Sequence, residues 1–263
     1  MQKIAIENIK TTQKQQEMIV AMNQELKIAR EIHQSILPQF IPDIKDVKIH
    51  VSYIPMAEIG GDIYEFVHNE LGDTLGVFIA DVTGHGIPAA LLSSILKATF
   101  TFHKNLYSDP AKLLREINST IISMNNNQML TAGYLFLNFQ DKTANYANSG
   151  HPPLLVWRKD LNTIESFYPE GKIIGWLEDS GNRSITIPFR KGDKFYLYTD
   201  GITEVRRKSN EIWGDENFKK FLLEYSTIPM EDMVRDLLQT LRNFSGREEE
   251  GFEDDITFIC IEV

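Results

Sequence analysis

The sequence predicts an α+β protein in which antiparallel sheets carry helices on their outer faces. Strand patterns outnumber helices, and most connections have the length of a hairpin loop. The strands and helices also do not alternate as they do in a parallel βαβ fold. With 263 residues and 42% apolar content, the chain is long enough to bury a sizeable core.

The first predicted element is one long helix over residues 1 to about 37, which contain no proline or glycine before Pro38. Its apolar residues follow a heptad spacing, broken in one slot by His33: Ile19, Met22, Leu26, Ala29 and Ile36. This narrow seam fits either packing on the helix's own domain or a dimerising, signal-carrying role. We therefore expect two parts, a helical linker, dimerisation or regulatory segment (1–40) and one globular domain (41–263).

The globular part is expected to begin with three strands and two helices, at 47–53, 63–67, 75–80, 88–107 and 110–125. Period-two alternation indicates the first of these strands, and apolar residues on one helical face indicate the second helix. Further strands are expected at 130–139, 143–148, 153–157, 164–168, 184–189 and 193–199. Helices at 215–225 and 230–244 and a strand at 256–262 complete the chain.

Composition excludes several classes of protein. The formal net charge is −10 and no long basic run occurs, which argues against binding to a nucleic-acid backbone. The single cysteine, Cys260, lies in an apolar run and is expected to be a buried strand residue without a disulfide or CxxC metal site. No apolar stretch approaches the ~20 residues that span a bilayer, and no signal-peptide core is present. We expect a soluble, cytoplasmic protein.

Aspartates recur beside glycine at the ends of predicted strands. An apolar run stops at Asp81 and then turns through Gly84 and Gly86 into a helix. Similar arrangements occur at three other places: Gly60-Gly61-Asp62, Asp200-Gly201 and Asp254-Asp255. Carboxylates that converge on one sheet end repel one another unless cations neutralise them. Oxygen ligands without a His or Cys cluster favour Mg²⁺ or Mn²⁺, and two such ions ~4 Å apart could activate a water for attack on phosphorus.

Other catalytic patterns are absent from the sequence. No G-x-S-x-G elbow and no P-loop occur. Two turn histidines, His85 and His151, could each donate a proton to a leaving alkoxide. Both could equally be turn residues that make backbone hydrogen bonds.

Five motifs occur in the order seen in metal-dependent protein phosphatases. They are Gly60-Gly61-Asp62, Ala80 to Gly86 with Pro88-Ala89-Ala90, Asn148 to Pro153, Tyr198 to Glu204, and Asp254 to Thr257. From about residue 28 onward the chain resembles the bacterial, SpoIIE/RsbU-like branch of that family, whose entry helix is similar to residues 29–38. The resemblance implies a four-layer αββα sandwich, two antiparallel β-sheets flanked by pairs of helices. It also implies hydrolysis of phosphoserine or phosphothreonine by a water that bridges two Mn²⁺ or Mg²⁺ ions.

The resemblance assigns metal-site roles to individual residues. Asp81 would bridge both metals, and the Val82 carbonyl would bind one of them. Asp200 and Asp254 would hold the other metal, and Asp62 would bind directly or through water. Asp255 would then orient these metal-binding residues or act as a further metal ligand.

Two departures from the eukaryotic pattern limit this transfer. The histidine that follows the bridging aspartate is displaced, because His85 stands four residues after Asp81. No arginine shortly precedes Asp62 to clamp the phosphate, where the charged residue is Glu58. We therefore expect the surface of the protein substrate to supply much of the binding energy.

The leading hypothesis is an active phosphoprotein phosphatase in partner-switching signal transduction. Its substrate would be a phosphorylated anti-anti-sigma (STAS-domain) protein, and the N-terminal helix would form a homodimer or dock on an upstream sensor domain. The alternative is a catalytically degenerate family member that acts as a binding or sequestering scaffold. A third possibility is a two-metal phosphoesterase that acts on small molecules or nucleic acid.

Overall fold

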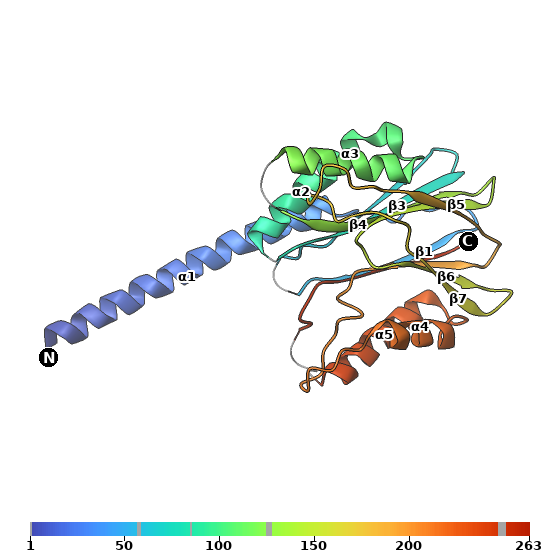
Figure 1. Cartoon of the computed structure of the whole chain (residues 1–263). Helices are drawn as coiled ribbons and strands as arrows, with labels where there is room; N and C mark the ends of the chain where they lie inside the picture. The colour runs from blue at the N-terminus through green and yellow to red at the C-terminus, as the bar shows by residue number, and fades with distance from the viewer. Residues whose placement is uncertain (1, 57–58, 85, 125–127, 247–250) are drawn as a thin grey trace.

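The computed structural model of the chain describes residues 2–56, 59–84, 86–124, 128–246 and 251–263. Two five-stranded antiparallel sheets lie face to face, and a pair of helices covers the outer face of each sheet (Figure 1). This arrangement confirms the α+β class and the four-layer αββα sandwich.

The two sheets contain every strand that the sequence predicts, with ends that differ by no more than two residues. The first sheet runs in the order β1 (Lys48–Ile54), β10 (Ile256–Glu262), β9 (Lys194–Tyr198), β6 (Leu154–Arg158) and β7 (Thr163–Phe167). The second runs β2 (Ile63–His68), β3 (Thr74–Val82), β4 (Leu130–Asn138), β5 (Thr143–Ser149) and β8 (Ser184–Pro188).

The helices pair as the sequence order suggests. Helices α2 (Ile87–Phe102) and α3 (Pro110–Ser123) pack on the second sheet, while α4 (Asp215–Glu224) and α5 (Met230–Ser245) pack on the first. The helix expected over 88–107 ends early, at Phe102, and a short 3-10 turn (η1, Lys104–Leu106) follows. The His103 N–H bonds to both the Thr99 and Phe100 carbonyls, which closes the helix. The turn then brings Tyr107 back to stack on Phe100, with ring centroids 4.9 Å apart.

The three inner strands of the first sheet, β10, β9 and β6, are buried on both faces, which explains their nearly continuous apolar sequence. In β9, Phe195 and Leu197 belong to the core between the sheets. Tyr196 and Tyr198 alternate with them and face α4 and α5, where the Tyr198 ring lies 4.7 Å from that of Phe218. Cys260 is buried and free, as expected.

The first helix, α1 (Gln2–Ile36), projects away from the sandwich (Figure 1). Its C-terminal end packs against α2, where His33 is only 3% exposed and Lys97 Nζ donates to the Ile36 carbonyl. Toward the N-terminus, Ile19 and Met22 are 57% and 61% exposed. In the described part of the chain, no helix is long and apolar enough to cross a membrane.

Candidate metal centre

Asp62 and Asp81 lie opposite each other where β2 and β3 meet. The antiparallel register pairs Ile63 with Ala80, which places the residues before β2 beside the end of β3. Asp62 is 1% exposed, and its Oδ2 accepts hydrogen bonds from the hydroxyls of Thr199 (2.8 Å) and Thr257 (2.6 Å). These threonines belong to the other sheet, so the Asp62 carboxylate joins the two sheets at this end.

Asp200 and Asp254 lie at the same end of the first sheet. The Thr199 N–H donates to the Thr257 carbonyl at 3.0 Å, which continues the β9–β10 pairing up to Asp200. The Glu204 N–H donates to the Asp200 carbonyl at 2.7 Å, which closes the turn after β9. Asp254 comes shortly before β10, which runs antiparallel to β9, so it lies at the same end of the sheet as Asp200. Both aspartates therefore project from the strand ends that adjoin Asp62.

Burial and mutual repulsion raise the pKa values of these carboxyl groups. Burial, then the charge of Asp81, raises the pKa of Asp62 well above its ordinary value. Burial raises the pKa of Asp81 to about 7, and Asp200 and Asp254 add to the shift. Burial, then Asp254, raises the pKa of Asp200 to about 6, and burial also raises that of Asp254. The four carboxyl groups thus lie close enough to influence one another's ionisation, and bound cations would reduce the repulsion between them.

Asp255 uses both carboxylate oxygens to hold the backbone around Asp62. Its Oδ1 accepts from the Met56 N–H at 2.7 Å, and its Oδ2 accepts from the N–H groups of Gly61 (2.5 Å) and Asp62 (3.3 Å). These bonds fit the orienting role better than that of a metal ligand.

Two glycines in the motifs are required by close approach of neighbouring backbone. A Cβ on Gly61 would lie 2.6 Å from the Val82 carbonyl oxygen, and one on Gly201 would collide with the Asp255 carbonyl. A side chain at either position would push apart the segments that carry the acidic residues.

The two candidate proton donors differ in position. His85 lies outside the described residues. His151 is buried between the sheets, where its Nδ1 is 2.8 Å from the Thr131 hydroxyl and its N–H donates to Asn148 Oδ1. Burial lowers the pKa of His151 to about 3, although the Tyr198 carbonyl opposes the shift. A neutral, buried imidazole is a poor general acid, so the structure favours the turn-residue interpretation of His151.

The donor set fits a hard divalent cation by its chemistry. All the candidate ligand atoms are oxygens, and a bound cation would neutralise the repulsion between the carboxylates. Within the described ranges, however, no three acidic, imidazole or thiol side chains already converge closely enough to hold a metal.

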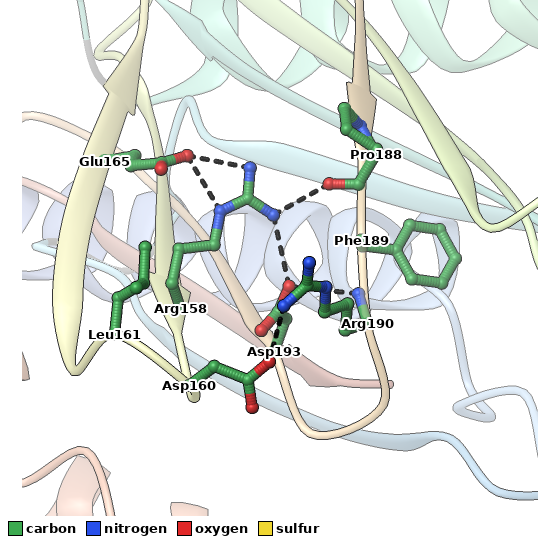
Figure 2. Close-up of a pocket in the computed structure, with 8 residues that line it drawn as sticks. All are labelled: Arg158, Asp160, Leu161, Glu165, Pro188, Phe189, Arg190 and Asp193. Atoms are coloured by element: carbon green, nitrogen blue, oxygen red, sulfur yellow. Dashed lines mark hydrogen bonds and ion pairs between the residues drawn. The ribbon is translucent and has the colours of Figure 1, made fainter.

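A pocket of about 350 Å³ lies at the opposite end of the sheets (Figure 2). Arg158 is the last residue of β6 there and donates to Glu165, to the Pro188 carbonyl and to Asp193. Asp193 stands at the start of β9, whereas Asp200 follows its end. Glu165 and Asp193 pair with Arg158, and Asp160 pairs with Arg190, so both arginines that line this pocket already have carboxylate partners.

Around the four aspartates, three further residues were not anticipated from the sequence. Thr199 and Thr257 fix Asp62, and both lie inside motifs whose aspartates drew attention instead. His33 is the third: Asp255 is the charge that opposes the effect of its burial, which lowers the His33 pKa. Its position explains the break in the heptad seam, because this slot faces the globular domain rather than a partner helix. The break in the heptad series was the sequence signal that could have identified His33.

Stacked antiparallel sheets, paired outer helices and carboxylates at one common strand end define a domain of the metal-dependent protein phosphatase (PP2C) class. The fold resembles the SiaA-PP2C domain of Pseudomonas aeruginosa with a TM-score of 0.81 and 22% identity, over 92% of this chain and 97% of that domain. It also resembles RsbX, solved in complex with magnesium, with a TM-score of 0.61 and 19% identity over 85% and 98% of the two chains.

Sequence comparison is more specific. Residues 72–263 match the family described as Stage II sporulation protein E (SpoIIE), so the chain belongs to the SpoIIE family. It is 26% identical to phosphoserine phosphatase RsbU of Bacillus subtilis, over 90% of this chain and 69% of RsbU. It is 27% identical to phosphoserine phosphatase RsbP of the same organism, over 91% of this chain and 58% of RsbP.

Proposed function

We propose that the chain is a protein-serine/threonine phosphatase that removes phosphate from a partner protein with the help of two Mn²⁺ or Mg²⁺ ions. The observation that carries this proposal is the shared electrostatic field of Asp62, Asp81, Asp200 and Asp254 at one end of both sheets. Membership of the SpoIIE family and the similarity to two phosphoserine phosphatases support it.

The protein's part in the reaction follows from how each group is held. Asp81 interacts electrostatically with Asp200 and Asp254 and would hold the ions together with the Val82 carbonyl, while Asp200 and Asp254 would bind from the other sheet. Asp62, whose carboxylate accepts hydrogen bonds from two threonine hydroxyls, would bind a metal ion directly or through water. The bound ions would supply an activated water and positive charge for the phosphoryl oxygens.

The substrate that we infer is a phosphorylated STAS-type anti-anti-sigma protein in the cytoplasm. The similarity to RsbU and RsbP supports this class of partner. The free, buried Cys260 fits a reducing compartment. The segment 1–40 would regulate the domain 41–263, through a homodimer or an upstream sensor, because exposed apolar residues on α1 leave a surface for a partner helix.

The test is the hydrolysis of p-nitrophenyl phosphate and of a serine-phosphorylated STAS-domain protein from the same genome, with Mn²⁺. We expect Asp81→Asn to abolish both activities while leaving the fold intact. Full activity of Asp81→Asn would refute the mechanism. Wild-type protein that binds the phosphoprotein but takes up no divalent ion in calorimetry would support the scaffold alternative instead.

A further inference from the structure

Four exposed apolar side chains gather at the C-terminal end of α3. We call them the apolar rim: Met124, Met129, Trp176 and Leu177, with exposed fractions between 37% and 57%. The segment before Trp176 is tied to the start of β4, since Ile174 and Leu130 exchange backbone hydrogen bonds of 3.0 and 3.2 Å. Gly175 also packs close to Ile121 in the last turns of α3. Residues far apart in sequence therefore form one surface.

The rim is held rigidly, although its side chains are exposed. Asn118 of α3 is fully buried, and its Nδ2 donates to the carbonyls of Leu177 (2.9 Å) and Glu178 (3.1 Å). Its Oδ1 accepts from the Gly175 N–H at 2.9 Å. One buried amide thus fixes the backbone on both sides of Trp176. A large aromatic side chain presented to solvent on a fixed backbone is typical of an interface hot spot.

The rim lies next to the strand end that carries the candidate metal ligands. Leu130 pairs with Val82 in the β3–β4 register. The Thr83 N–H and hydroxyl both donate to the Met129 carbonyl, at 3.3 and 2.8 Å. With neighbouring strands ~4.8 Å apart, Trp176 lies roughly 10–15 Å from the Val82 carbonyl. This separation is too long for one phosphoserine side chain to bridge and suits a folded domain that carries the phosphoserine.

We propose that the apolar rim docks the folded phosphoprotein substrate, so that Trp176 determines the affinity for the protein but not the chemistry at phosphorus. This inference rests on the proposed function and identifies where substrate affinity arises. The acidic residues Glu178 and Asp179 border Trp176. Together with a net charge of −10, they select a partner with an apolar patch and basic flanks, and they disfavour an anionic membrane or nucleic acid.

Trp176 also supplies a direct signal of docking. The chain contains three tryptophans, and Trp157 and Trp213 are only 4% and 6% exposed. Trp176, at 57%, is the one whose fluorescence emission should move to shorter wavelength when a partner covers it. The predicted blue shift on adding the phosphorylated STAS-domain protein should vanish in Trp176→Ala.

The decisive experiment compares Trp176→Ala with a matched control, Phe102→Ala. Phe102 is 81% exposed but ends α2, about 20 Å along the helix from its start near Asp81. For Trp176→Ala we expect the Kd and KM for the phosphorylated STAS-domain protein to rise about tenfold or more. Its kcat/KM for p-nitrophenyl phosphate should stay within about twofold of wild type, and Phe102→Ala should change neither quantity.

An unchanged Kd in Trp176→Ala, or equal losses on both substrates, would overturn the docking proposal. The direct Kd measurement separates this inference from the proposed function. If wild-type protein hydrolyses neither substrate with Mn²⁺, the phosphatase proposal fails, while the Kd of the two variants still decides whether the rim binds the partner.

Discussion

Removing the charge of Asp81 should stabilise the metal-free protein at alkaline pH, although it destroys the candidate metal site. Burial, and then the charges of Asp200 and Asp254, raises the pKa of Asp81 from its ordinary value of 3.8 to about 7. At about 1.4 kcal/mol per unit, ionised Asp81 places about 4 kcal/mol of unfavourable free energy on the metal-free fold. Asparagine removes the charge but leaves a buried amide that lacks ideal partners, which costs about 1–3 kcal/mol. The expected net gain for Asp81→Asn at pH 8 is about 1–3 kcal/mol.

Urea unfolding with a chelator at pH 5 and pH 8 measures this gain, and Asp43→Asn, at an exposed position, is the control. At pH 5 Asp81 is protonated in the fold but still ionised in the unfolded chain, so its cost falls to about 1–2 kcal/mol, and the cost of the buried amide should cancel the advantage of asparagine. Mn²⁺ should reverse the order at pH 8, because ions that bind only the folded wild type stabilise it by mass action. Two results would contradict this expectation. One is an Asp81→Asn protein that is less stable than wild type at pH 8 in chelator. The other is stabilisation of Asp81→Asn by Mn²⁺ to the same extent as wild type.

Three further outcomes follow from the same geometry. Metal-free wild-type protein should lose stability relative to Asp200→Asn as pH rises from about 4 to 6, because the raised pKa of Asp200 keeps its carboxyl group protonated in the fold at pH values where the unfolded chain has lost that proton, and the comparison cancels the opposite effect of the lowered His151 pKa; a Tm difference in chelator that does not change over this window would contradict the assignment. Thr257→Val should leave the Asp62 carboxylate with one hydroxyl partner and weaken Mn²⁺ binding by about tenfold in calorimetry, whereas Thr186→Val, at an exposed strand position, should not; equal Mn²⁺ affinities would show that Thr257 does not position Asp62. Met22→Glu should halve the mass measured by light scattering if α1 pairs two chains, and a monomeric wild type would remove the dimer proposal.

Much of the fold could be predicted because its local signals agree. The aspartate–glycine turns mark strand ends, and Pro110 and the Asp109 cap mark the start of α3. The end of α2 could not be predicted in this way, since no glycine or proline stops the helix. It ends at Phe102 because Tyr107 must return to stack on Phe100, which is a tertiary contact.

The candidate site was predictable in its acidic residues but not in their environment. Sequence order indicates that Asp62 and Asp81 lie at strand ends, but not that Thr199 and Thr257 bind Asp62 from the other sheet. Likewise, the burial of His151, which removes it as a proton donor, depends on how the two sheets stack. The contacts of Asp62 join residues more than a hundred positions apart, and no local pattern records them.

Anomalous diffraction from crystals grown with Mn²⁺ would show whether the four distant aspartates form one site for paired divalent ions. We predict two manganese peaks enclosed by Asp62, Asp81, Asp200 and Asp254, and neither peak in Asp81→Asn crystals. Manganese bound elsewhere on the chain, or none at this end of the sheets at saturating concentration, would contradict the claim.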